Sequence, residues 1–224
     1  MICIIQARMG SKRLPGKVLM KIGKDNILNK LILSVKKVIG ISDIIIATTL
    51  NREDNKIINY CKKNKINYFR GSTSNVASRF YKILTLKDSK YFIRLNADSP
   101  FLDYRIIKKL ISKIKDNNFD IITNVLKKSF PKGQSVEILK KEIYIKHYKK
   151  INNKYDKEHV TSYFYKNKKK FKIYNYFNRQ NFSNINLSID TIKDLKKIRN
   201  ISARIKNKNF NWKNLVSIYL KYYE

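Results

Sequence analysis

The chain has 224 residues, of which 43% are hydrophobic, and this is enough for one domain with a full core. Its formal net charge is +34 at pH 7, from 50 Lys and Arg against 16 Asp and Glu. Cys3 and Cys61 lie in apolar segments without metal-ligand spacing, and we expect both to be reduced. The sequence starts directly with a strand-like run and has no apolar stretch of membrane-span length. We therefore predict a cytoplasmic globular protein with no membrane partner.

The excess of positive charge allows two interpretations. Cations alternate with aromatic residues in segments 163–170 and 171–177, which is typical of nucleic-acid binding. However, lysines fall on most predicted helix faces rather than on one. We favour a generally cationic surface that attracts anionic substrates and binds no specific nucleic acid. A basic nucleic-acid-binding protein on an α/β scaffold remains the alternative function.

Short apolar runs alternate along the chain with segments of helical periodicity. The runs that predict buried strands are residues 2–5, 43–47, 66–69, 91–95 and 120–124. The segments that predict helices are residues 27–38, 52–64, 74–84 and 106–114, with Ser74 as an N-cap. This alternation with short connections predicts the α/β class, with a parallel sheet covered by helices on both faces.

The pattern changes after residue 124. A turn at 130–133, an extended piece at 136–139, helical stretches at 141–149 and 158–167, and an aromatic strand at 171–177 follow. We predict that residues 125–180 form a β-rich insertion within a single domain of residues 1–224, which covers the site or pairs two subunits. Residues 185–189 are expected to return to the sheet. Thr191 and Asp194 resemble a capping box for the next helix, and an amphipathic helix from Trp212 ends the pattern.

The first strand runs into a basic loop that contains glycine. Residues 7–17 hold Gly10, Gly16 and four cations, Arg8, Lys12, Arg13 and Lys17. Such a loop at the carboxyl end of a strand is where α/β folds bind phosphates. Neither the Walker A pattern nor the dinucleotide glycine pattern is present.

Two aspartates follow predicted strands at the same edge of the sheet. Asp98 could hold Mg²⁺ opposite the basic loop, or it could start a turn before Pro100, and the spacing alone does not separate these readings. Asp190 alone is better explained as a helix cap, and only a partner such as Asp98 favours a metal role.

Other polar residues have local explanations as strong as functional ones. Gln6 could cap the sheet edge, Arg70 could be a surface cation, and Glu158 suits the first turn of a helix. The two histidines show no zinc-ligand spacing.

Residues 4–19, IIQARMGSKRLPGKVL, resemble the opening signature of cytidylyltransferases of the spore coat polysaccharide biosynthesis type. These enzymes are related to acylneuraminate and 3-deoxy-manno-octulosonate cytidylyltransferases. The other segments that match are residues 46–49, 69–72, 94–100, 158–161 and 189–195. The resemblance therefore extends over nearly the whole chain.

The resemblance implies a three-layer α/β/α nucleotidyltransferase fold, Rossmann-like, with a mixed sheet. It implies transfer of CMP from CTP to an anionic acceptor, a sugar acid or another carboxylate- or phosphate-bearing metabolite, with release of pyrophosphate. Arg8 and Lys17 would contact the triphosphate, the backbone near Ala7 would approach cytosine and ribose, and Asp98 and Asp190 would hold Mg²⁺. Arg8, Lys17 and Asp98 are the predicted catalytic residues.

Further site residues are predicted with these. Nucleotide contacts are expected from Gln6, Gly10, Ser11, Arg70 and Asn96, and acceptor contacts from Glu137, Glu158 and His159. A homodimer through residues 125–180 is expected by analogy. Segment 76–79, VASR, lacks an aspartate found in the family pattern, so the acceptor stays open. A nucleotide-binding relative without catalysis is a second alternative.

Overall fold

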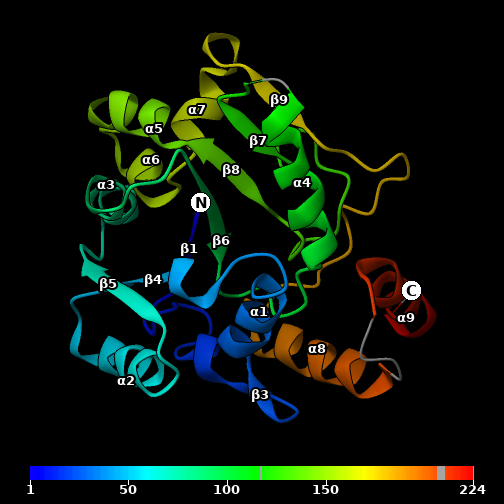
Figure 1. Cartoon of the computed structure of the whole chain (residues 1–224). Helices are drawn as coiled ribbons and strands as arrows, with labels where there is room; N and C mark the ends of the chain where they lie inside the picture. The colour runs from blue at the N-terminus through cyan, green and yellow to red at the C-terminus, as the bar shows by residue number, and fades with distance from the viewer. Residues whose placement is uncertain (117, 206–209, 224) are drawn as a thin grey trace.

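The computed structural model describes residues 1–116, 118–205 and 210–223 (Figure 1). Within them, seven strands form one sheet in the order β5-β4-β1-β6-β8-β7-β9. Their bounds are β1 Ile2–Gln6, β4 Ile44–Thr49, β5 Asn67–Gly71, β6 Tyr91–Asn96, β7 Ile121–Thr123, β8 Glu137–Lys140 and β9 Ile173–Asn175. All neighbouring strands pair in parallel except β8, which is antiparallel to β6 and β7. The mixed α/β sheet that was predicted is confirmed.

Successive hydrophobic side chains along a strand point to opposite faces of the sheet, and this builds a core on each face. In β1, Cys3 and Ile5 belong to one buried cluster, whereas Ile2 and Ile4 belong to the other. The first face is covered by α1 (Ile27–Val35), α2 (Asn55–Lys63), α4 (Tyr104–Asp116), α8 (Ile192–Arg204) and α9 (Trp212–Tyr223). The second is covered by α3 (Val76–Leu86), α5 (Lys141–His147) and α7 (Ser162–Lys166), with α6 (Lys154–Glu158) beside α3. Figure 1 shows α3, α5 and α6 on the side of the sheet away from α1 and α4. The molecule is therefore a three-layer α/β/α structure.

Local capping sets where several helices begin. The predicted capping box is confirmed, because Thr191 and Asp194 exchange side-chain and backbone hydrogen bonds at the start of α8. The N-cap of α3 is Asn75 and not Ser74, since the Asn75 side chain accepts from Ser78 N at 2.9 Å. A two-stranded ribbon, β2 (Lys21–Ile22) with β3 (Asp25–Asn26), precedes α1.

Residues 125–180 are not the β-rich insertion that was expected. Strands β8 and β9 join the central sheet, and most of the remaining secondary structure consists of the short helices α5, α6 and α7. The helix expected at 158–167 begins only at Ser162, because Glu158 ends α6 and Val160 has a φ of 36°. Residues 185–189 form no strand and make a single β-bridge, from Lys132 to Asn186. The sheet thus ends at β9, and residues 185–189 are held by backbone hydrogen bonds to Lys132 and Asp98 instead.

Two further expectations can be compared with the structure. Cys3 and Cys61 are free and buried, as predicted. None of the helices in the described residues is both long enough and apolar enough to cross a bilayer.

The carboxyl ends of β1, β4 and β6 are joined into one edge beyond the strands themselves. Ala7 N donates to Ala47 O at 3.1 Å, and Ala97 N donates to Gln6 O at 3.1 Å. Ile189 N then donates to Asp98 O at 3.0 Å. These bonds bring the basic loop and both candidate aspartates to the same place.

Candidate active site

The basic loop after β1 folds back on itself. Ser11 N and Gly16 N donate to Met9 O at 2.8 and 2.7 Å, and Gly16 has a φ of 73°, which glycine adopts without strain. The 3₁₀ turn Lys17–Leu19 follows directly. The loop therefore presents its cations from a closed turn.

Asp54 anchors this loop to the neighbouring strand. Its side chain is fully buried and accepts from Met9 N at 2.6 Å, while Thr48 Oγ1 and Thr49 N donate to its other oxygen at 3.0 and 3.1 Å. The Thr49 hydroxyl donates to the same oxygen. Sequence reasoning missed this role, because Asp54 looks like an ordinary acidic residue at the start of a helix.

Lys17 brings the two candidate metal-binding aspartates together. Its ammonium lies 3.1 Å from Asp98 Oδ2 and 2.9 Å from Asp190 Oδ1, and it donates to Ile189 O at 2.6 Å. Arg13 Nη2 lies 3.0 Å from the other oxygen of Asp190. The reading of Asp190 as a helix cap is wrong, because Thr191 is the N-cap of α8.

The environment of Asp190 favours its ionised form. Burial raises the pKa of this carboxyl, but the hydrogen bond and charge of Lys17, together with Arg13, outweigh burial and hold the pKa below its usual value. Asp190 is therefore a carboxylate at neutral pH.

Asp98 and Asp190 supply two carboxylates that could hold one cation between them. One cation, the Lys17 ammonium, already bridges the two carboxylates. No third acidic, histidine or cysteine side chain completes a cluster with them in the described part of the chain. Mg²⁺ is commonly held by one or two carboxylates, with substrate phosphates and water supplying the rest. The donor set suits a metal that arrives with a nucleotide.

A cavity of about 390 Å³ opens beside this cluster. Its lining is strongly polar and comes from the basic loop, the end of β6, the turn after α6, and Asp190. The residues are Gln6, Ala7, Arg8, Ser11, Lys12, Arg13, Lys17, Val18, Arg94, Asn96, Ala97, Asp98, Glu158, His159 and Asp190. Within this lining, Arg8 Nη2 forms an ion pair with Glu158 Oε1 at 3.0 Å. Most of the predicted site residues thus meet in one place.

Three predicted site residues lie outside this lining. Arg70 donates from Nε to Thr49 O at 2.9 Å and from Nη2 to Asn51 O at 3.0 Å, so it holds the turn after β4. A Cβ on Gly10 would lie 2.5 Å from Glu53 Oε1, so this glycine allows a close approach within the protein. Glu137 is buried in an ion pair with Arg94 and faces no cavity found beside the site.

A second cavity, of about 330 Å³, shares Asn96, Asp98 and Asp190 with the first. Its other walls come from the turn between β7 and β8 and from the segment before α8. They are lined by Ser99, Asn124, Val125, Lys128, Phe130, Pro131, Lys132, Gly133, Ser135, Ser183 and Ser188. The paired aspartates therefore stand at a boundary between two cavities, one basic and one rich in hydroxyl groups.

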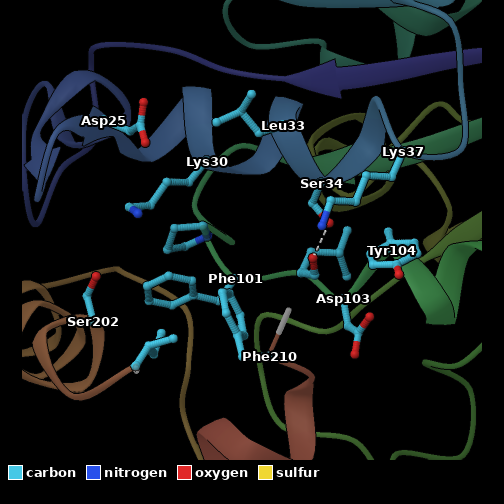
Figure 2. Close-up of a pocket in the computed structure, with 13 residues that line it drawn as sticks. Asp25, Lys30, Leu33, Ser34, Lys37, Phe101, Asp103, Tyr104, Ser202 and Phe210 are labelled. Carbon is cyan, nitrogen blue, oxygen red and sulfur yellow. Dashed lines mark hydrogen bonds between the residues drawn. The ribbon is translucent and has the colours of Figure 1, made fainter. Parts of the chain in front are cut away.

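A third cavity, of about 550 Å³, lies between α1, the loop after β6, and the end of α8 (Figure 2). Figure 2 shows Phe101 and Phe210 in its wall, with Lys30 on α1 and Lys37 in the turn that follows α1. Its two carboxylates support the fold, because Asp25 accepts from Asn29 Nδ2 at 2.7 Å and Asp103 accepts from Trp212 N at 3.0 Å. This cavity lacks the paired carboxylates and the basic loop.

Sequence reasoning gave no role to Arg94, although it lines the first cavity. Arg94 and Asn96 occupy alternate positions of β6, and Asn96 pairs with Gln6 of β1. Polar side chains at alternate positions of a central strand are the signal that could have indicated them.

Comparison with known proteins agrees with this geometry. A family model described as cytidylyltransferase matches residues 2–219. An uncharacterised protein of Methanocaldococcus jannaschii is 39% identical over 200 residues, 87% of this chain and 80% of the relative. The spore coat polysaccharide biosynthesis protein SpsF of Bacillus subtilis is 33% identical over 166 residues, 71% of this chain and 68% of SpsF.

A solved cytidylyltransferase from Leptospira borgpetersenii superposes with a TM-score of 0.91 at 28% identity. The match covers 98% of this chain and 93% of that structure. The family match spans the basic loop, both aspartates and the cavity between them. The chain belongs to the cytidylyltransferase family and is a CTP-dependent nucleotidyltransferase.

Proposed function

We propose that this enzyme transfers CMP from CTP to a small anionic acceptor in surface-polysaccharide or glycoconjugate synthesis. The observation that carries the proposal is the Lys17 ammonium held between Asp98 and Asp190, beside a loop with three further cations. A triphosphate needs this density of positive charge, and nucleotidyl transfer depends mainly on positioning and charge neutralisation.

The chain's own residues have distinct tasks in this reaction. An acceptor oxygen attacks the α-phosphorus of CTP, the bond from the α-phosphorus to the oxygen that bridges it to the β-phosphate breaks, and pyrophosphate leaves with the electron pair. A hydroxyl acceptor releases its proton to water in this step, whereas a phosphate oxygen attacks as an anion and has no proton to lose. Arg8 and Lys17 offset charge on the phosphates and on the leaving pyrophosphate, with Lys12 and Arg13 as supporting charges. Asp98 and Asp190 would hold Mg²⁺, which would supply charge stabilisation at the reacting phosphate when bound. Gln6, Ala7, Ser11 and Asn96 line the cavity that would take the nucleoside.

The second cavity is where we place the acceptor. It reaches Asp98 and Asp190, so a hydroxyl bound there can approach the α-phosphate. Its serine-rich walls suit a polyhydroxylated molecule. Lys128 and Lys132 are exposed at this cavity and form no ion pair among the residues described, so they are available to a carboxylate or phosphate. Glu158 and His159, expected to contact the acceptor, lie in the first cavity instead.

A pyrophosphate-release assay with CTP and Mg²⁺ tests this function. The acceptor panel contains 3-deoxy-manno-octulosonate, glucose 1-phosphate and the neutral sugar glucose. We expect CTP-dependent pyrophosphate release with an anionic acceptor and none with glucose. Lys128→Gln with Lys132→Gln should raise the KM of the active acceptor and leave the KM of CTP unchanged. Release with glucose alone would contradict the anionic acceptor.

The homodimer remains a proposal supported by exposed apolar side chains. Leu126, Tyr155 and Phe177, all within residues 125–180, are 37%, 57% and 49% exposed. Such side chains suit an interface between copies. Mass photometry at micromolar concentration should show dimers, and monomers alone would contradict the proposal. A cytoplasmic location is supported by the two unpaired buried cysteines and is tested by cell fractionation.

A further inference from the structure

Arg94 lines the first cavity and donates to two side-chain amides. Its Nη2 donates to Gln6 Oε1 at 3.2 Å and to Asn96 Oδ1 at 3.2 Å. Gln6 and Asn96 are direct partners across β1 and β6, and both line the cavity. One guanidinium nitrogen therefore bridges the ends of two central strands.

The chemistry of arginine fixes the orientation of both amides. A guanidinium carries donors and no acceptor, so each amide must turn its oxygen toward Arg94. The NH₂ groups of Gln6 and Asn96 then point away from it. Neither nitrogen donates a hydrogen bond within the described part of the chain, and neither is a buried group without a partner. Both NH₂ groups thus remain accessible in the cavity.

Buried partners hold Arg94 in place on its other side. Arg94 Nη1 forms an ion pair with Glu137, whose side chain is 4% exposed, and Tyr165 donates its hydroxyl to Glu137 Oε1 at 2.6 Å. Arg94 and Glu137 face each other in the β6–β8 register. Burial lowers the pKa of Arg94, but the charge and hydrogen bond of Glu137 reverse this, so the guanidinium stays charged. Burial raises the pKa of Tyr165, and its hydroxyl stays a donor.

Arg94 is poorly placed to bind a ligand anion itself. Its side chain is 12% exposed, and Glu137 already balances its charge. Its Nε is buried without a partner among the described residues, whereas its Nη1 bonds to Glu137 and its Nη2 to the two amides. The contacts that reach the cavity are those it makes to the amides.

We propose that Arg94 is a positioning residue that turns the NH₂ groups of Gln6 and Asn96 into the cavity, where they donate to oxygen or ring-nitrogen acceptors of the bound nucleotide. This inference rests on the proposed function, because the ligand it names is CTP. Glu137 was predicted to contact the acceptor, and in this proposal it instead fixes the position of the Arg94 side chain. The NH₂ groups of Gln6 and Asn96 then favour ligand atoms that accept hydrogen bonds.

Two substitutions of Gln6 separate its oxygen from its nitrogen. Gln6→Glu keeps an oxygen for Arg94 and removes the NH₂ donor, whereas Gln6→Met removes both. Calorimetric titration with CTP, without acceptor, should show a dissociation constant raised about 3- to 10-fold in both variants, the worth of one hydrogen bond. Only Gln6→Met should lower the melting temperature, because only it removes an acceptor from Arg94. If Gln6 only supported the fold, CTP affinity would fall only in the variant that also loses stability, Gln6→Met.

Arg94 variants test the positioning itself. Arg94→Lys keeps the charge opposite Glu137, but one ammonium cannot reproduce the planar fork that reaches both amides. It should weaken CTP binding nearly as much as Arg94→Met. Full recovery of affinity in Arg94→Lys would overturn the proposal.

Two other results would also overturn it. One is wild-type affinity in both Gln6 variants. The other is a loss confined to Gln6→Glu that disappears at 1 M salt, which would show charge repulsion alone. A wild-type protein that binds no CTP would overturn the proposed function, and this inference with it, so the two failures are distinguishable.

Discussion

Arg8 and Glu158, 150 residues apart, form an ion pair of 3.0 Å in the lining of the basic cavity. Arg8 follows β1, and Glu158 is the last residue of α6. Each side chain is 36% exposed, so water screens the pair and its own contribution is small. A triphosphate that uses Arg8 must compete with this carboxylate.

Glu158→Gln should therefore strengthen CTP binding. The substitution removes a competing charge and keeps the size of the side chain. Because an exposed ion pair contributes little, we expect the affinity for CTP to rise about 2- to 5-fold. Calorimetric titration with CTP measures the change. Glu142→Gln on α5 is the matched control, since Glu142 is exposed and outside the cavity. Unchanged or weaker binding in Glu158→Gln would contradict the competition.

Lys17→Met should retain the fold and lose most activity. Lys17 contacts both aspartates, and loss of one such electrostatic group costs about 10²–10³ in rate. Pyrophosphate release gives the rate, and circular dichroism checks the fold. Lys12→Met is the control, because Lys12 is exposed and forms no ion pair in the described part of the chain. Its loss should be less than tenfold, and equal losses would contradict a special role for Lys17.

Asp156 joins α6 to α7 and should make the stability of the fold depend on pH. Burial raises the pKa of this carboxyl, but hydrogen bonds from Lys166, Ser162 and Asn153 outweigh burial, so its pKa is lowered on folding. A lowered pKa stabilises the fold above the unfolded value, near 3.9, and the gain is lost as pH falls through the folded value. Asp156→Asn should cost about 1–3 kcal/mol at pH 7. The difference from wild type should shrink below about pH 4 in chemical unfolding. A constant difference from pH 7 to pH 3 would contradict this.

The sequence allowed the meeting of Asp98 with the basic loop to be predicted, because both follow strands whose carboxyl ends share one edge. Asp190 reaches the same point for another reason. Residues 185–189 form no strand, and the bond from Ile189 N to Asp98 O places them. Here the location was right, although the expected strand was wrong.

The Arg94–Glu137 pair could not be predicted in the same way. It depends on β8 running antiparallel to β6 in the register that sets these two residues opposite each other. The local sequence of 136–139 specifies an extended segment, but neither its direction nor its partner strand. The role of Asp54 could not be predicted from the local sequence either, because its contact with Met9 joins residues 45 positions apart.

Asp54→Asn should destabilise the protein and weaken CTP binding together. The buried carboxylate accepts from Met9 N, Thr48 and Thr49, and an amide cannot accept all of these bonds. We expect a loss of about 1–3 kcal/mol in the free energy of unfolding, as for a buried donor left unpaired. Chemical unfolding and CTP titration measure the two effects. Asp88→Asn, at an exposed position, should change neither. Loss of stability with unchanged CTP affinity would show that the loop does not depend on Asp54.

Gly133 and Gly23 form a matched pair for testing the wall of the acceptor cavity. Both have a positive φ, 92° and 64°, so alanine is strained at either position. A Cβ at Gly133 would lie 2.9 Å from Leu187 C and O, whereas nothing lies within 4 Å of a Cβ at Gly23. The backbone at Gly133 is fixed, because Lys132 N donates to Ile185 O and Leu187 N donates to Lys132 O, both at 2.9 Å.

Gly23→Ala should therefore cost about 1 kcal/mol of unfolding free energy, the strain of the backbone alone. Gly133→Ala should cost about 1–3 kcal/mol more, because the segment that leads to Asp190 must move. The same movement should lower kcat/KM in Gly133→Ala, while Gly23→Ala keeps wild-type activity. Chemical unfolding and pyrophosphate release measure the two effects. Equal stability losses in the two variants would show that the Leu187 backbone yields without cost, and the rigid cavity wall inferred from these contacts would be wrong.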